Sequence, residues 1–133
     1  MTTYLLVIVG RILFGGYFLM SGIQHFVNAD MLSRYAASKG VPGGKVAVYG
    51  SGLLLIAGGL GVLSGMYIPW AVAALALFFV PVSFAMHAFW SAEPNQRMGE
   101  SINFMKNMAL LGAALLLLSV PEPWVYALSY FLQ

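Results

Sequence analysis

The sequence contains no cysteine and very few charged residues. Only 8% of its 133 residues are charged, six Lys and Arg and four Asp and Glu, whereas 61% are hydrophobic. Without cysteine, the chain can form no disulfide, has no thiol nucleophile and cannot ligate an iron–sulfur cluster. A soluble domain needs about a quarter of its residues charged. The composition therefore predicts an integral membrane protein.

A basic segment is also missing before the first apolar stretch. The chain begins Met1-Thr2-Thr3 and then continues with a long hydrophobic run. Because a secretory signal has a basic start and a short apolar core, we expect no cleavable signal peptide.

Four apolar stretches are long enough to cross a bilayer, which takes about 20 helical residues. The predicted spans are Tyr4 to Ile23, Val46 to Leu63, Tyr67 to Trp90 and Ile102 to Val120. Their apolar runs are continuous rather than alternating, which disfavours a β-barrel. The sequence predicts an all-α membrane protein whose residues 1–133 form a single four-transmembrane-helix bundle.

The segments between the spans differ in charge. The loop from Phe26 to Lys45 includes a short amphipathic segment that starts near Asn28 and is broken by the glycines that follow residue 39. A second charged loop covers residues 91–101, and the aromatic tail, residues 124–133, is expected at the membrane interface. We call the end with both termini and the turn at residues 64–66 side A, and the opposite end side B.

The basic loop residues all fall on side B. They are Arg34, Lys39, Lys45 and Arg97. The positive-inside rule therefore predicts that side B faces the cytoplasm, with the protein in a bacterial cytoplasmic (inner) membrane.

The second span is rich in glycine, and Gly61 and Gly65 form a GxxxG pair. Small residues let two membrane helices approach closely, so we interpret these glycines as a packing surface.

Arg11 is the residue least suited to its surroundings, because a guanidinium inside a membrane helix costs at least a few kcal/mol. Spacings of three and four residues place it on one helix face with Gly15, Phe18, Gly22 and His25. We interpret this stripe as one wall of an elongated cavity, with Arg11 as its deep anchor, bonded to backbone carbonyls, a ligand or water. The alternative is that Arg11 snorkels towards side A.

Polar side chains from three predicted spans converge near side B. They are Gln24 and His25 in the first span, His87 in the third, and Asn103, Lys106 and Asn107 in the fourth. The structural alternatives are a snorkelling lysine and histidines that bond to backbone carbonyls. Two histidines at one depth would also suit a haem, but no other haem signal is present, so we expect no metal or haem.

No acidic residue lies within a predicted span, which makes the expected site cationic and rich in amides. Proton or cation transport through a buried carboxylate is therefore disfavoured. A ligand with carbonyl acceptors fits better, and a quinone head group with an apolar tail is such a ligand.

Two segments resemble DoxX-type membrane proteins. Residues 11–26, Arg-Ile-Leu-Phe-Gly-Gly-Tyr-Phe-Leu-Met-Ser-Gly-Ile-Gln-His-Phe, resemble their first-helix signature, and residues 87–112 resemble their third-to-fourth helix junction. The order and spacing match from about Val9 to Val120. The resemblance implies a four-helix membrane bundle linked to quinone-connected oxidoreductases, such as the thiosulfate:quinone type, usually with a second soluble subunit. Relatives in this family also include redox-stress partners and assembly chaperones.

We therefore expect the membrane subunit of a redox system that binds a quinone and works with a separate electron-donating partner, soluble or membrane-bound. The alternative is a non-enzymatic scaffold or assembly factor, and homo-oligomers fit either function. A solute transporter fits poorly, because the chain shows no internal repeat. Nucleic acid is not an expected partner, and no residue is assigned to catalysis. The residues predicted to bind the ligand are Arg11, Gln24, His25, His87, Asn103, Lys106 and Asn107.

Overall fold

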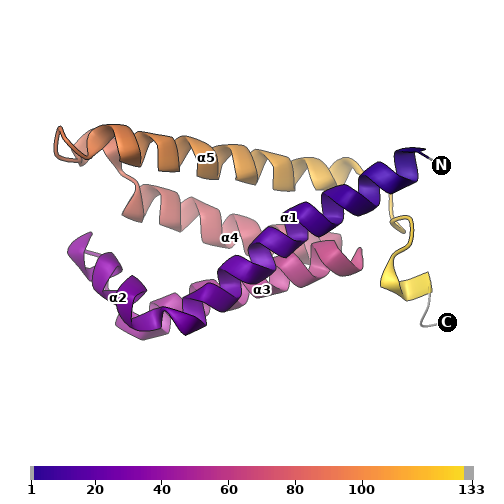
Figure 1. Cartoon of the computed structure of the whole chain (residues 1–133), viewed down its shortest axis with the longest axis horizontal. Helices are drawn as coiled ribbons and strands as arrows, with labels where there is room; N and C mark the ends of the chain where they lie inside the picture. Colours follow the sequence, from indigo (N-terminus) through magenta and orange to yellow (C-terminus); the bar gives the residue numbers. More distant parts are fainter. Residues whose placement is uncertain (1, 131–133) are drawn as a thin grey trace.

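The computed structural model describes residues 2–130, which form helices, turns and loops but no strand. The helices are α1 (Thr2–Val27), α2 (Ala29–Ser38), α3 (Gly44–Ser64), α4 (Ile68–Met86) and α5 (Arg97–Leu116), with 3-10 turns η1 (Phe89–Ser91), η2 (Leu117–Ser119) and η3 (Leu128–Tyr130). The helices α1, α3, α4 and α5 are long and apolar enough to cross a membrane, which confirms the predicted all-α class. Both termini lie at side A and α2 lies at side B (Figure 1).

The ends of the spans differ from the prediction, and helix α1 continues to Val27, four residues past Ile23. Helix α4 ends at Met86, four residues before Trp90, so His87 is its C-cap and Trp90 belongs to the separate turn η1. Helix α5 begins at Arg97, five residues before Ile102, because the backbone N–H groups of Gln96 and Arg97 both donate to the carbonyl of Glu93 and start the helix there. An acidic residue is favourable in a first helical turn, and Glu100 occupies that turn. The apolar stretch alone did not reveal that the helix begins in the polar segment before it.

The four spans pack as a row that is open on one side. Helix α1 packs along α3, α3 along α4, and α4 along α5, while α2 packs mainly on α3. Among the described residues, the two outer helices α1 and α5 hardly touch. In Figure 1, α5 lies beside α4 and away from the crossing pair of α1 and α3 on side B.

Helices α1 and α3 approach each other through glycine. A Cβ added to Gly15 would lie 2.9 Å from the carbonyl oxygen of Gly59, and one added to Gly22 would lie 2.8 Å from that of Gly52. Such separations leave no room for any side chain, so the backbones are in direct contact. The close packing expected from the glycines is thus present.

The two glycines of the GxxxG pair have different roles. Gly61 packs against Ala71 of α4, whereas Gly65 lies outside the helix as its C-cap, with a positive φ of 68°. Gly50 of the same helix meets no atom within 4 Å of an added Cβ, so it belongs to no helix interface.

The core lies among all four spans, and the chain's last described segment packs onto it at side A. Its centre contains fully buried Phe18, Leu55 and Leu75. After α5 the chain turns back, and Trp124 and Ala127 join this core, being 2% and 1% exposed. The described part of the tail therefore lies at the side-A end of the bundle, where it packs on the core. Residues 131–133 of the predicted tail lie outside the described residues.

We expect Gly59→Ala to destabilise the fold, because the added Cβ would lie 2.6 Å from the backbone nitrogen of Leu19. Overpacking of this kind costs about 1–3 kcal/mol. Gly16→Ala is the matched control, since a Cβ there meets nothing within 4 Å and alanine favours a helix. Thermal unfolding in detergent should show a lower Tm for Gly59→Ala alone; equal Tm values would contradict backbone contact at this position.

Candidate functional site

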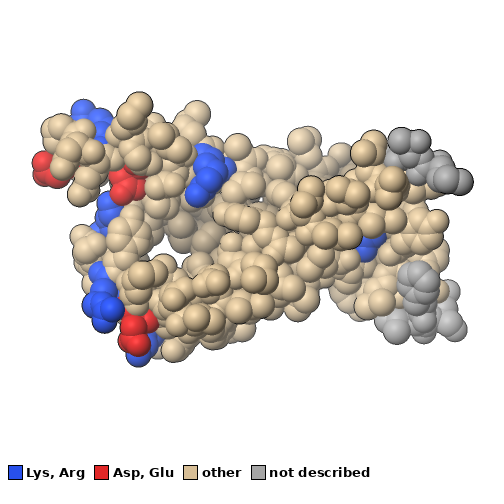
Figure 2. Space-filling view, in the orientation of Figure 1, with Lys and Arg blue, Asp and Glu red and all other residues tan. Residues whose placement is uncertain are grey.

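Charged residues are distributed unevenly between the two ends. Figure 2 shows them gathered at the end that carries α2 and the loop before α5, which is side B. Arg11, by contrast, lies near side A, where it reaches the end of α3 and the tail. The two ends therefore hold two separate polar sites.

Arg11 is bonded to backbone carbonyls. Its Nε donates to the carbonyl of Val62 at 3.2 Å, and its two terminal nitrogens donate to Leu63 at 2.7 Å and Val125 at 2.8 Å, with a longer contact of 3.3 Å to Tyr126. The last carbonyls of a helix lack partners within it and carry partial negative charge. The guanidinium thus caps the C-terminus of α3 and fastens the tail to it.

The bonds to backbone carbonyls predicted for Arg11 are confirmed, but they place it at side A rather than beside the polar residues of side B. Arg11 is level with Gly65, where α3 ends, and a Cβ on Gly65 would lie 2.8 Å from one of its terminal nitrogens. Within the predicted stripe, Gly15 and Gly22 press against α3 and Phe18 is buried in the core. The stripe is therefore largely a packing face, and its role as a cavity wall stays a prediction.

We expect Arg11→Met to release the tail, because the carbonyls of Leu63 and Val125 would lose a charged donor. Hydrogen bonds to charged groups contribute about 1.5–3 kcal/mol. The control is Arg97→Met, since Arg97 is exposed and makes one long contact of 3.5 Å. Faster hydrogen exchange across residues 124–130 in Arg11→Met alone is the expected result; unchanged exchange would refute the tether.

At side B, Glu100 joins three segments of the chain. Its Oε1 accepts from Nζ of Lys39 at 2.5 Å, and its Oε2 lies 2.8 Å from Nδ1 of His87. Glu100 is 8% exposed, so its carboxylate is largely shielded from water, and both of its oxygens contact these partners. The contact ties the end of α2 and the end of α4 to the start of α5.

The prediction that no acidic residue lies in a span is wrong, because the fourth span runs from Arg97 to Ser119 and includes Glu100. Neither Glu100 nor Lys39 was among the predicted site residues. The turn at residues 94–96, which begins with Pro94 and directly precedes Arg97, was the feature that could have located Glu100 inside the helix.

The hydrogen bond to Glu100 raises the pKa of Lys39 above its ordinary value. A raised pKa means that the pair's contribution is complete below the ordinary lysine pKa of about 10.4 and is lost as the pH rises through the higher folded value. A double-mutant cycle of Lys39→Met and Glu100→Gln, followed by thermal unfolding, should give a coupling energy of about 0.5–3 kcal/mol near pH 7. The coupling should disappear at strongly alkaline pH.

The pair Lys45–Asp30 is the control for this cycle, because its side chains are 51% and 70% exposed and such pairs contribute little. A Lys39–Glu100 coupling no larger than that of the exposed pair would show that Glu100 does not hold α2.

A cavity of about 510 Å³ lies next to this cluster, and we call it the side-B cavity. All four spans and α2 contribute to its wall, which is mostly apolar. Four residues predicted to bind a ligand line it: His25, His87, Lys106 and Asn107. Tyr35 and Ala36 of α2 close it on side B, and Gly50 contributes a wall without a side chain.

The polar groups in this wall differ in how they are bonded. Asn107 is 6% exposed, and neither its amide nor the ammonium of Lys106 takes part in the hydrogen bonds recorded among the described side chains. Nδ1 of His25 lies 2.8 Å from the carbonyl oxygen of Ser21. Because a carbonyl only accepts, Nδ1 carries the proton, and Nε2 is the acceptor of the neutral ring.

The remaining predicted site residues lie outside the wall of the side-B cavity. Gln24 is exposed and accepts a hydrogen bond of 2.6 Å from the amide of Asn28. That bond also means that Asn28, at the N-cap position of α2, does not cap it with its side chain. Asn103 is partly buried, but it does not line the cavity, and Arg11 is at the other end of the molecule.

A second hollow, which we call the lateral groove, lies between α1 and α5 and has a volume of about 600 Å³. Its wall is almost entirely apolar, with Arg11 and Trp124 at its side-A end. The indole Nε1 of Trp124 is buried, and no described residue accepts its hydrogen bond.

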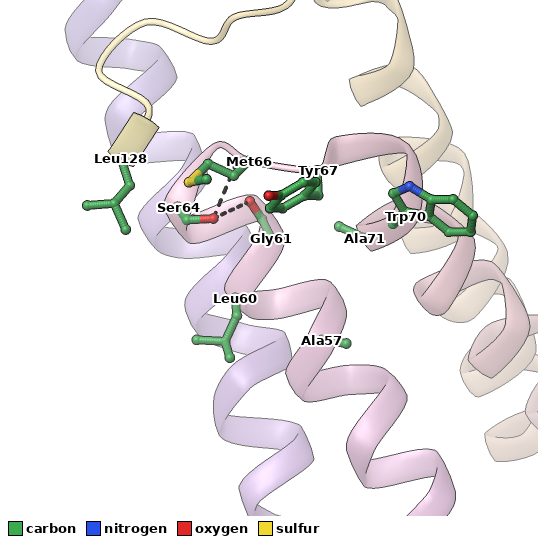
Figure 3. A pocket seen from close by; sticks show the side chains of 9 residues that line it. All are labelled: Ala57, Leu60, Gly61, Ser64, Met66, Tyr67, Trp70, Ala71 and Leu128. Carbon is green, nitrogen blue, oxygen red and sulfur yellow. Dashed lines mark hydrogen bonds between the residues drawn. The ribbon is translucent and has the colours of Figure 1, made fainter. Parts of the chain in front are cut away.

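A third pocket of about 400 Å³ lies at side A around the α3–α4 turn (Figure 3). Its polar atoms are already paired, since the hydroxyl of Ser64 donates to the carbonyl of Gly61 at 3.1 Å and accepts from the N–H of Met66 at 3.3 Å. The exposed side chains of Tyr67 and Trp70 at its rim are typical of residues at a membrane interface. We therefore assign it no chemistry.

Comparison with known proteins gives one result. The model of one protein family, described as DoxX, matches residues 6–88, which is more than half of the chain and includes most of α1 through all of α4. No curated protein and no solved structure is similar enough to match.

Proposed function

We propose that this chain, which belongs to the DoxX family, is the membrane subunit of a redox system and binds a quinone in the side-B cavity. A bound quinone would couple electron transfer to the uptake of protons, with the electrons supplied by a separate donor protein. The observation that carries the proposal is the meeting of His25, Lys106 and Asn107, from the first and fourth spans, in one mostly apolar cavity.

The residues of the cavity fit the head group of such a ligand. A quinone presents carbonyl oxygens, which only accept hydrogen bonds, and Asn107 and Lys106 both offer donors. A quinone oxygen placed against the mostly buried amide of Asn107 would give this group a hydrogen-bond acceptor, a contact worth about 0.5–1.5 kcal/mol. The positive charge of Lys106 would also favour electron density on the ligand.

Histidine supplies the means of moving protons. His25 holds its ring by the bond from Nδ1 to Ser21, which leaves Nε2 to take up or release a proton. His87 contacts both the cavity and Glu100, and Glu100 contacts Lys39 in the loop. We infer that this chain of groups exchanges protons between the cavity and side B.

The placement of the charges supports an orientation. The basic loop residues on side B favour the cytoplasmic face of a bacterial inner membrane, and the electron donor would then dock on the side-B loops. A donor with an acidic surface suits Arg34 and Arg97, which are both exposed.

One observation favours a second candidate, a scaffold or assembly factor. Glu100 pairs with Lys39 and His87 inside the protein, which is what a purely structural polar cluster does. On that hypothesis, cavity variants would leave partner recovery unchanged and loop charges would control it.

We expect quinone to be extracted from protein purified in mild detergent, or to bind to protein reconstituted with it. Gly50→Phe should abolish binding, because Gly50 lines the cavity and its side chain would project into open space. Gly112→Phe is the control, since a Cβ there also meets nothing and the residue lines none of the cavities described above. Asn107→Leu should weaken binding about tenfold, the equivalent of one lost hydrogen bond.

Folded wild-type protein that holds no quinone under either condition would reject this function. Equal binding by Gly50→Phe and the wild type would place the ligand elsewhere.

A further inference from the structure

We propose that the side-B cavity and the lateral groove are two parts of one cleft, and that the cleft selects ligands with a long apolar tail. The head group would occupy the side-B cavity, and the tail would lie along the groove between α1 and α5 towards Trp124. This inference rests on the proposed function, because it describes the rest of the same ligand.

The wall that α1 contributes is continuous from one hollow to the other. Tyr17 lines both. Gly10 and Phe14 line the groove on one side of it, and Ser21 and His25 line the cavity on the other. Their spacings of three and four residues place them in one stripe, beside the face that packs on α3.

Helix α5 provides the opposite wall in the same way. Asn107 lines the side-B cavity, and Leu110, Ala113 and, at the start of η2, Leu117 line the groove at spacings of three and four residues. Two facing stripes, each running from the cavity to the groove, define a path rather than two unrelated hollows.

The path is long, apolar and bounded at its far end. From His25 to the level of Arg11 along α1 is about 21 Å at 1.5 Å per residue. Most of the polar groups line the side-B end, whereas the side-A end is bounded by Trp124 and by Arg11, whose guanidinium is already bonded to backbone carbonyls. This polarity matches an amphiphile with one polar ring and a long chain.

Small residues hold the groove open. Gly10 meets no atom within 4 Å of an added Cβ, and Ala113 lies in the opposite wall. An apolar chain that occupies the groove would gain dispersion contacts along its whole wall. Because the groove continues into the head-group cavity through Tyr17, we assign its filling to the tail of the bound ligand rather than to surrounding lipid.

The test compares binding of quinones that share one head group and carry no tail, a short tail or a long polyprenyl tail. Gly10→Leu fills the groove, and Gly16→Leu is the control on the same helix, since Gly16 meets nothing within 4 Å and lines none of the hollows described above. Ala113→Phe, from the opposite wall, replaces Gly10→Leu if that variant does not fold. Equilibrium binding and the ligand-induced shift in Tm are the two readouts.

We expect affinity in the wild type and in Gly16→Leu to rise at least tenfold from the tail-less to the long-tailed quinone. In Gly10→Leu the tail-less quinone should bind as it does to the wild type, while the gain from the tail is lost. If the affinity of Gly10→Leu still rises with tail length, the tail only partitions into detergent or lipid. That result would refute the proposed cleft. Binding of the tail-less quinone with no gain from a tail in the wild type would overturn the cleft alone, whereas absence of binding by every quinone would overturn the proposed function with it.

Discussion

The direct backbone contact between α1 and α3 determines how the rest of the molecule is arranged. Glycines at facing positions bring the two helices together over several turns, which commits one face of α1 entirely to α3. The same contact carries Arg11 to the end of α3 and leaves the neighbouring face of α1, from Gly10 to His25, without a helix partner. Because α5 is held through α4 and not through α1, the bundle has an open seam, and both larger hollows lie along it.

Buried charge is stabilised by different partners at the two ends of the molecule. At side A the partners of the cation among the described residues are backbone carbonyls, whose partial negative charges at the end of a helix stabilise it. At side B a carboxylate is shared between a lysine and a histidine, one of which faces a cavity. The first arrangement fastens the tail to α3, whereas the second brings a histidine to the wall of the side-B cavity.

Much of the fold was predictable because it depends on local pattern. Apolar length located the four spans, and helical spacing identified the buried face of α1 from Arg11 to His25. The same patterns brought His25, His87, Lys106 and Asn107 together at one end, since topology alone requires it. The predictions that were wrong concern contacts between segments that are distant in the sequence. The partners of Arg11 come from the end of α3 and from a tail more than a hundred residues away, and the role of Glu100 depends on a helix start hidden in a polar loop.

The tether formed by Arg11 also has a consequence for biogenesis. Chains emerge from the ribosome N-terminus first, and α1 and α3 can pair through their glycines before α5 exists. At that stage Arg11 can already reach the carbonyls of Val62 and Leu63, which shields its charge from lipid. The carbonyl of Val125 follows α5 in the chain, so it becomes available only after the fourth span has been made. The hydrogen bond from Arg11 to Val125 therefore joins α1 to a segment that is made after all four spans.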